Sequence, residues 1–228
     1  MRQTIGLGML LGCGLFPLGA GAEVDHGVSL SVVQIRGYRE EGRVFYGSGV
    51  VVGPNRVATN CHVTRSAIRV VVNKGPLSYQ AASQQADTRR DLCLLAVPGI
   101  PFPVANLGQS EKLAVGQPLY FYGYPHGIGI SFSEAHVQAL HPFEGSRVIE
   151  TTADFTFGGS GGGMFDGAGR LVGLATFLSA GQSHGYAIPS DWISSLDSLE
   201  PRGIEPLPGL TFWEDVAALP GFLRPPGR

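Results

Sequence analysis

The chain has 228 residues, of which 43% are apolar and only 15% charged, against about 25% charged in an average domain. It can therefore bury a sizeable core, and extensive disorder is excluded. Its formal charge of -2 comes without any basic run, so no nucleic-acid partner is expected. The 34 glycines and 16 prolines punctuate short apolar runs, a pattern that disfavours long helices.

The first 22 residues have the layout of a secretory signal peptide. An apolar stretch from Ile5 to Leu18 is followed by Ala20-Gly21-Ala22, a cleavage site of the A-x-A type. Because this stretch is shorter than the ~20 residues of a membrane span, we expect cleavage and no stable membrane insertion afterwards. Leu10-Leu11-Gly12-Cys13 also resembles a bacterial lipobox, so lipidation at Cys13 is an alternative. Both routes predict a secreted or periplasmic protein.

Short apolar runs between turn signals predict an all-β sandwich or barrel from Ser29 onward. A Pro/Gly-rich connection over residues 98–116 separates two groups of expected strands. The first group covers residues 30–35, 44–46, 50–52, 68–72 and 92–97, and the second covers residues 119–122, 137–140, 148–151, 163–165, 171–177 and 186–188.

One helix is expected after the last strand. Ser190 is a good N-cap, and the helix should run to Leu199 before Pro201 stops it. Residues 201–228 read as an irregular Pro/Gly-rich tail, partly docked through Phe212 and Trp213, with a short helical stretch around residues 213–219. The predicted organisation is a signal peptide over residues 1–22, one domain over residues 23–200 and the tail over residues 201–228.

Three segments contain candidate catalytic residues. His62 ends the expected strand Arg56-Val57-Ala58-Thr59-Asn60-Cys61-His62, Asp91 starts the apolar run Asp91-Leu92-Cys93-Leu94-Leu95, and Ser160 lies in the glycine run of residues 158–163. Taken alone, each has an ordinary structural role: a packed histidine, a turn carboxylate and a glycine-rich hairpin loop.

Together these segments supply what acyl transfer needs. The reaction requires a hydroxyl nucleophile, a neutral imidazole that takes its proton, and a carboxylate that fixes the tautomer of the imidazole. Ser160, His62 and Asp91 would fill these roles. The negative oxygen of the tetrahedral intermediate needs two converging N–H donors, and the amides of Gly158 and Ser160 are the natural pair.

The order His, Asp, Ser, within "GSGVVV…VATNCHV", "RRDLCLL" and "GGSGGGMFDGAGRLVGLAT", resembles the trypsin-like (chymotrypsin-fold) serine proteases, especially the bacterial HtrA-type branch. The resemblance covers roughly residues 29–199. It implies two packed six-stranded antiparallel β-barrels with a C-terminal helix. The catalytic cleft would lie between the barrels, with His62 and Asp91 from the first barrel and Ser160 from the second.

Three departures from the family pattern stand out. Gly159 and Gly163 replace the Asp or Asn and the Pro or Ala that relatives usually carry there. Without an acid at position 159, activation by a buried N-terminal amine is not expected. The 29 residues after Leu199 are too few for the PDZ domain that HtrA enzymes usually carry.

The resemblance also implies substrate-binding residues. Thr176, Phe177 and Leu178 would line the primary pocket, and Leu178 would shorten it. Asp154 aligns with the acid that gives trypsin its basic preference, although we expect it to point to solvent. His184 could reach the cleft, as histidine does in glutamate-specific relatives. Small aliphatic, basic and acidic preferences therefore all stay open, with the aliphatic one favoured.

Cys61 precedes His62 directly, and Cys93 lies two residues after Asp91. A fold that brings His62 to Asp91 therefore brings the two sulfurs close, and we expect a Cys61–Cys93 disulfide in an oxidising compartment. Two buried free thiols are the alternative.

The predicted function is a secreted or periplasmic serine endopeptidase that acts on proteins or peptides without a metal or organic cofactor. The first alternative is a trypsin-fold protein that binds peptides with little or no turnover, because glycines on both sides of Ser160 could loosen the nucleophile loop. A lipidated envelope binding protein is a third class, and it depends on acylation of Cys13.

Overall fold

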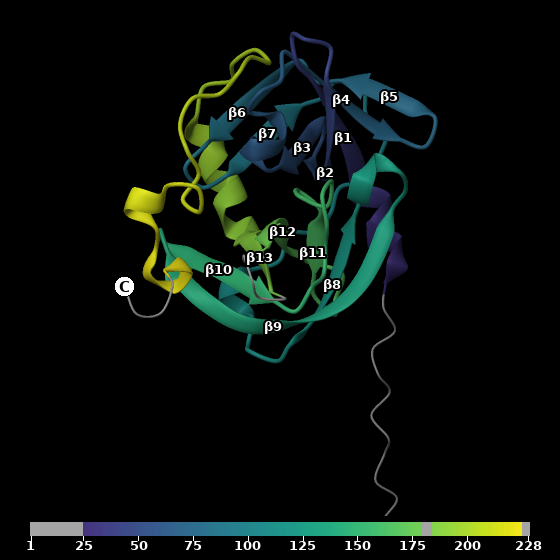
Figure 1. Cartoon of the computed structure of the whole chain (residues 1–228). Coiled ribbons are helices and arrows are strands. Elements are labelled where there is room, and N and C mark those ends of the chain that lie inside the picture. Colours follow the sequence, from purple (N-terminus) through teal and green to yellow (C-terminus); the bar gives the residue numbers. More distant parts are fainter. Residues whose placement is uncertain (1–24, 179–183, 225–228) are drawn as a thin grey trace, which may run out of the picture.

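Two antiparallel β-sheets form the body of the described structure (Figure 1). The computed structural model describes residues 25–178 and 184–224. The expected signal peptide over residues 1–22, with Cys13, lies outside the described residues. Within them, no helix is long and apolar enough to cross a membrane.

The first sheet has seven strands in the order β5-β4-β1-β2-β3-β7-β6, and it is curled rather than closed. The segment between the edge strands β5 and β6 brings the two edges of the sheet close together. In this segment the N–H of Ala81 donates to the carbonyl of Val70 in β4, and the N–H of Ala82 donates to the carbonyl of Ala96 in β7. Its strands are β1 (Val32–Tyr38), β2 (Val44–Gly53), β3 (Arg56–Thr59), β4 (Arg69–Lys74), β5 (Leu77–Gln80), β6 (Ser83–Asp87) and β7 (Leu92–Ala96).

The second sheet is a closed barrel of six antiparallel strands in the order β10-β13-β12-β11-β8-β9. Its strands are β8 (Pro118–Gly123), β9 (Ser131–Phe143), β10 (Ser146–Thr151), β11 (Gly163–Phe165), β12 (Leu171–Leu178) and β13 (Gly185–Pro189). The chymotrypsin-like architecture is confirmed, with one difference in detail: the first of the two expected six-stranded barrels is an open seven-stranded sheet.

Each sheet encloses an apolar cluster of its own, and a third cluster joins the two sheets. This third cluster contains Val50 of β2, Leu94 of β7 and Phe165 of β11, all almost fully buried. Non-polar burial between the sheets stabilises their docking, and the docking holds the two halves of the candidate site together.

Seven short helical segments accompany the sheets within residues 25–178 and 184–224. The one expected after Ser190 is present as η4 (Ser190–Ser198), but it is a 3-10 helix with the tighter i→i+3 bonding. The others are η1 (His26–Ser31), α1 (Cys61–Thr64), η2 (Ser110–Lys112), η3 (Pro125–Gly127), η5 (Val216–Ala218) and η6 (Gly221–Leu223).

The tail after η4 returns along the first sheet. Gln84 of β6 and Arg202 exchange backbone hydrogen bonds, and the N–H of Leu207 donates to the carbonyl of Arg65. Phe212 is almost fully buried in the cluster between the sheets. The described part of the tail is therefore packed against the domain rather than separate from it.

Candidate active site

His62 lies in α1, the single helical turn that follows β3, and not at the end of a strand as the sequence suggested. Its Nδ1 atom is 2.7 Å from Oδ2 of Asp91. A carboxylate only accepts hydrogen bonds, so this contact requires the proton on Nδ1 and leaves Nε2 as the free acceptor. The His62 ring is about one-fifth exposed toward the cleft.

Asp91 is fully buried in the turn between β6 and β7. Its φ of 57° is left-handed, a conformation that aspartate tolerates better than most residues. Burial of a carboxylate is costly without hydrogen bonds. Asp91 receives three on its carboxylate: from the His62 amide to Oδ1 (2.8 Å), and from His62 Nδ1 (2.7 Å) and Trp213 Nε1 (3.0 Å) to Oδ2.

The backbone around this pair is also fixed. The carbonyl of Asp91 accepts from the Cys61 amide at 3.2 Å and from Asn60 Nδ2 at 3.0 Å. Strands β3 and β7 pair so that Thr59 faces Cys93. The sulfur atoms of Cys61 and Cys93 lie at bonding distance from each other, and the Cα atoms of the two residues are 4.9 Å apart. The segments that carry His62 and Asp91 are thus joined at several points.

Ser160 lies in the loop that leads into β11 and faces the same cleft as His62. Its hydroxyl donates to the carbonyl of Thr176 at 3.1 Å. In the described part of the chain no hydrogen bond joins Ser160 to His62. The Ser160 carbonyl accepts from the Ser48 amide of β2 at 2.8 Å, so the first sheet holds the backbone of the loop directly.

The peptide between Phe157 and Gly158 is oriented by its carbonyl, which accepts from the His126 amide at 2.6 Å. In a trans peptide the N–H points the opposite way, so the Gly158 N–H is directed away from His126. Gly158 has a φ of 91°, and a Cβ there would lie 2.6 Å from the carbonyl oxygen of Tyr124. Glycine is therefore required. The Gly158 carbonyl accepts from the Ser48 hydroxyl at 2.7 Å.

The next two peptides are anchored in the same way. The Gly159 N–H donates to Thr156 at 2.8 Å, and the Gly159 carbonyl accepts from Gly162 at 2.9 Å. The Ser160 N–H then points opposite to the Gly159 carbonyl. Among the described residues, the N–H groups of Gly158 and Ser160 have no acceptor. Two free donors beside a serine hydroxyl are what stabilisation of a developing oxyanion requires.

A cleft of about 580 Å³ contains both His62 and Ser160. Its lining comes from both sheets and from the tail: Arg39, Phe45, Tyr46, His62, Val63, Phe155, Thr156, Phe157, Gly158, Ser160, Thr176, Phe177, Leu178 and Trp213. The space is open to solvent and is mostly walled by apolar side chains, as is common for peptide-binding and ligand-binding clefts.

Three of the expected substrate-binding residues line this cleft. Thr176 is buried, and its hydroxyl donates to the carbonyl of Leu174. Mainly its backbone is therefore left to contact a substrate. Phe177 stacks on Trp213, and Leu178 is about half exposed. Asp154 is exposed and is not among the side chains that line the cleft.

His184 does not line the cleft either. Its Nδ1 is 2.9 Å from Glu150 Oε1, and His141 pairs with the other oxygen of the same carboxylate at 2.7 Å. Desolvation and the nearby Glu150 charge raise the pKa of Tyr186, beside this cluster, to about 12. Among the described residues, no group of three or more His, Cys, Asp or Glu side chains could hold a metal ion.

Among the residues that line the cleft, sequence reasoning missed Trp213 and Phe155 in particular. Trp213 was expected only to dock the tail, yet it reaches Asp91 and His62. Phe155 is buried at one end of the cleft, against Gly185 of β13. Neither carries a motif, although the aromatic pair Phe212-Trp213 in a Pro/Gly-rich tail was a signal that this segment docks.

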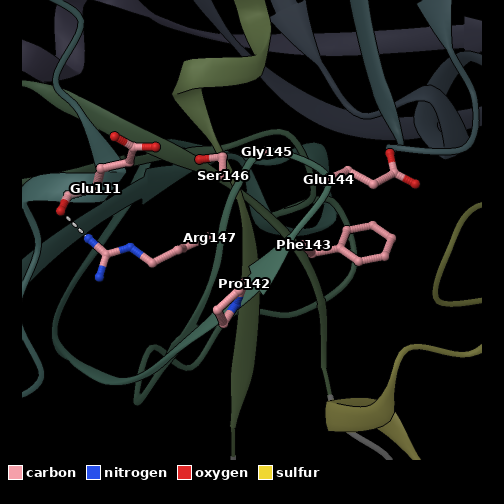
Figure 2. Close-up of a pocket in the computed structure, with 7 residues that line it drawn as sticks. All are labelled: Glu111, Pro142, Phe143, Glu144, Gly145, Ser146 and Arg147. Atoms are coloured by element: carbon pink, nitrogen blue, oxygen red, sulfur yellow. Dashed lines mark hydrogen bonds between the residues drawn. The ribbon is translucent and has the colours of Figure 1, made fainter.

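A second hollow, of about 630 Å³, lies at the turn between β9 and β10, away from these groups (Figure 2). Two of its charged side chains, Arg147 and Glu144, already have partners. Arg147 donates to the backbone of Glu111, and Glu144 pairs with Arg89 at 2.7 Å and Arg90 at 2.9 Å. Glu144 thereby ties the second barrel to the two residues that precede Asp91.

Comparison with known proteins adds independent evidence. The family described as a trypsin-like peptidase domain matches residues 47–174, a range that includes His62, Asp91 and Ser160. A "Probable periplasmic serine endoprotease DegP-like" from Pseudomonas putida (strain GB-1) is 33% identical over 171 residues, which are 68% of this chain and 35% of that protein. The chain thus spans about a third of the length of the curated relatives it matches.

Two solved structures are similar over most of the chain. The active form of the Rv3671c protease from M. tuberculosis matches 81% of this chain and 86% of that chain, with 25% identity and a TM-score of 0.71. The HtrA-type protease AlgW, solved with a tripeptide, matches 73% of this chain and 58% of that chain, with 26% identity and a TM-score of 0.67.

Proposed function

The chain belongs to the trypsin-like peptidase family, and we propose that it is a serine endopeptidase that hydrolyses peptide bonds of proteins or peptides. One observation carries the proposal: His62, hydrogen-bonded to the buried Asp91, faces a cleft that is also lined by Ser160 and Gly158, whose amide N–H groups have no acceptor among the described residues. All the groups that the reaction needs belong to the protein itself.

In the proposed acylation step, Ser160 Oγ attacks the carbonyl carbon of the scissile bond while His62 Nε2 takes the hydroxyl proton. Asp91 holds the ring with the proton on Nδ1 and stabilises the imidazolium. The carbonyl oxygen becomes an oxyanion and accepts hydrogen bonds from the Gly158 and Ser160 amides. To begin, the Ser160 hydroxyl must rotate from Thr176 toward His62.

Collapse of the tetrahedral intermediate then breaks the C–N bond. His62 Nε2 returns its proton to the leaving amine, and the acyl group stays on Ser160. Water attacks this ester with His62 as the base, and the second collapse restores the Ser160 hydroxyl and releases the new carboxylate.

Active-site labelling tests the proposal. A fluorophosphonate should label the wild-type protein once and leave Ser160→Ala unlabelled, and casein hydrolysis should follow the same pattern. The exposed Ser194 on η4 provides a matched control, because Ser194→Ala should change neither readout. Labelling that persists in Ser160→Ala would reject Ser160 as the nucleophile.

A second candidate function is peptide binding with little turnover. The bond from Ser160 to Thr176 favours it, because the nucleophile is not yet aligned with His62. Catalytic hydrogen bonds often tighten only when substrate is bound, however. A peptide that binds to wild-type protein, remains intact and does not enhance fluorophosphonate labelling would favour this alternative.

For specificity, we infer a preference for small aliphatic side chains just N-terminal to the scissile bond. A Cβ on Gly185 would lie only 2.5 Å from the Phe155 ring, so this ring fills the space against β13. Leu178 lies on the wall beside it. A filled pocket of this kind excludes long side chains, with a graded cost of ~1–3 kcal/mol for each methylene group.

A peptide-library cleavage profile tests this inference. Phe155→Ala should extend the preference from Val, Ala and Ile to Leu and Met, whereas Asp154→Ala should leave the profile unchanged. Dominant cleavage after Arg or Lys that disappears in Asp154→Ala would overturn the aliphatic preference and assign a basic one.

We further propose an exported, disulfide-bonded protein. The likeness to a periplasmic relative supports export, and the contact between Cys61 and Cys93 supports an oxidising compartment. Mass spectrometry of the mature N-terminus tests this: Glu23 as the first residue supports cleavage after Ala22, and an acylated Cys13 would instead support the lipoprotein route.

A further inference from the structure

The indole of Trp213 is a third element in the candidate site, beside the two sheets. Its Nε1 donates to Oδ2 of Asp91 at 3.0 Å, and this is the same oxygen that accepts from His62 Nδ1. The indole also meets the His62 ring edge-on, with centroids 5.4 Å apart and an interplanar angle of 89°. One side chain from the tail therefore touches both members of the pair.

Nearby groups do not replace this donor. The Thr176 hydroxyl is close to the same region, but it donates to Leu174 and accepts from Asn60 Nδ2. The side-chain NH2 group of Asn60 already donates to the Thr176 hydroxyl and to the Asp91 carbonyl. A buried carboxylate with an unpaired acceptor position costs free energy. Trp213 therefore supplies Asp91 with a hydrogen bond that neither sheet provides.

The residues on both sides of Trp213 are fixed to the segments that carry His62 and Asp91. The Phe212 amide donates to the carbonyl of Arg89, two residues before Asp91, at 2.8 Å. Glu214 accepts two hydrogen bonds from Arg65, three residues after His62, at 2.5 and 2.7 Å. The tail thus spans both segments with Trp213 between its two attachments.

A stacking contact sets the orientation of the indole. Trp213 stacks on Phe177 of β12, with centroids 5.0 Å apart and planes 20° from parallel. This contact comes from the second barrel, whereas Asp91 and His62 come from the first sheet. Offset stacking of aromatic rings is favourable beyond the area that it buries, so the N–H bond is aimed at Asp91 by packing.

We propose that Trp213 is a positioning residue for the His62–Asp91 pair, supplied by the tail rather than by either sheet. It holds the Asp91 carboxylate in the plane that keeps the His62 ring directed at Ser160. This inference rests on the proposed peptidase function. Trp213 touches neither the scissile bond nor the transferred proton, and its effect reaches the chemistry through Asp91.

The test compares Trp213→Phe with the wild type and with a matched control, Trp192→Phe. Phenylalanine keeps a ring on Phe177 but has no N–H group. Trp192 is also buried, and its Nε1 has no hydrogen-bond partner among the described residues, so the same change there removes no hydrogen bond. The readouts are kcat and KM for a peptide substrate, the melting temperature, and the downfield proton resonance of His62 Nδ1.

For Trp213→Phe we expect kcat to fall about tenfold, as for loss of one hydrogen bond to a charged group, with KM changed less than twofold. The resonance of the proton on His62 Nδ1 should shift, because this proton is bonded to Asp91 Oδ2, the same oxygen that loses the Trp213 donor. Trp192→Phe should leave kcat and the resonance unchanged. If Trp213→Phe proves unstable, Trp213→Met replaces it in the comparison. Methionine also fills space without an N–H donor, so the same fall in kcat and the same shift of the resonance are expected.

Two results would overturn the inference: an unchanged resonance with kcat within twofold of wild type in both Trp213 variants, or an equal fall in kcat in Trp192→Phe. A wild-type protein that hydrolyses nothing while the resonance still shifts in Trp213→Phe would reject the peptidase proposal and leave the positioning role intact. The two failures are thus distinguishable.

Discussion

The two sheets hold their parts of the candidate site in different ways. On the first sheet, His62 and Asp91 are joined by two hydrogen bonds, by backbone contacts and by the cysteine pair. On the second, the backbone around Ser160 is anchored at each peptide, but the hydroxyl itself donates to Thr176. The base is therefore preorganised, whereas the hydroxyl of the nucleophile candidate is hydrogen-bonded to Thr176 and not to the base.

This difference follows from the kind of group each sheet carries. A buried carboxylate must be fully hydrogen-bonded to be tolerated, so Asp91 fixes its surroundings. A serine hydroxyl rotates freely about one bond and can exchange one acceptor for another. Strong fixation of the base and free rotation of the nucleophile are thus compatible in one cleft.

The largest effect should come from breaking the preorganised side. Asp91→Asn keeps the size of the side chain but replaces an acceptor oxygen with an NH2 group, which favours the wrong tautomer of His62. We expect kcat to fall by about 10⁴, the loss seen for this change in serine proteases. Asp154→Asn, the same change at an exposed acid, is the control. A fall of less than tenfold would mean that Asp91 does not orient the base.

The second test breaks the anchored loop on the other sheet. Gly158→Ala would place a Cβ 2.6 Å from the Tyr124 carbonyl and displace one of the two free amides. We expect kcat for peptide hydrolysis to fall by about 10²–10³. Gly116→Ala is the control, because Gly116 has a φ of 84° but open space around it. Equal losses in both variants would assign the effect to backbone strain alone.

The third test concerns the covalent link on the first sheet. A bond between residues 61 and 93 closes a loop over a sequence separation of 32. Its removal in a Cys61→Ala, Cys93→Ala double variant should lower the free energy of unfolding by about 3–4 kcal/mol in the chain-entropy model. Denaturant unfolding measures this value. Two titratable thiols in the denatured, unreduced wild-type protein would contradict the disulfide.

The smallest expected effect is a pH dependence of the tail attachment. Hydrogen bonds from Arg65 lower the pKa of Glu214 to about 2 from its usual 4.5. A carboxyl group with a lowered pKa stabilises the folded state above pH 4.5, and this contribution disappears as the pH falls toward 2. At about 1.4 kcal/mol per pKa unit, the upper limit of this loss is about 3.5 kcal/mol, and the partial exposure of both side chains lowers it.

Unfolding of wild type and Glu214→Gln between pH 7 and pH 2 measures that contribution. The difference in unfolding free energy between the two proteins should be constant above pH 5 and should shrink below pH 4.5. A difference that stays constant down to pH 2 would show that the Arg65 contact does not stabilise the ionised form.

Strands with strong apolar runs were predictable from the sequence, as for β7 and β12. Strands β5 and β6 were not, because Leu77–Gln80 and Ser83–Asp87 carry mostly polar or exposed side chains at the two ends of the sheet. Each pairs with its neighbour in the sequence, β5 with β4 and β6 with β7, but neither has the apolar alternation that marks a half-buried strand.

The pairing of His62 with Asp91 was predictable, because both residues flank strands whose motifs occur in family order. Trp213 was not, since its contact with Asp91 joins residues that are 122 positions apart, and the tail around Trp213 carries no catalytic motif. Phe155 was missed for a similar reason. The Phe155 ring packs where a side chain at position 185 would lie, and this requires a glycine there. A glycine in a strand, however, can equally mark a bulge or a sharp bend, so its presence alone does not predict a packed ring.

Ser48 has a consequence for how the protein folds. It belongs to the first sheet, yet its amide and hydroxyl hold the carbonyls of Ser160 and Gly158, and it is fully buried. A second barrel that folds by itself would lack both anchors, so the proposed oxyanion site can form only when the sheets dock. Proteolytic competence would then arise at the last assembly step, and partly folded copies, whose loops are the easiest to cut, would be unable to digest one another.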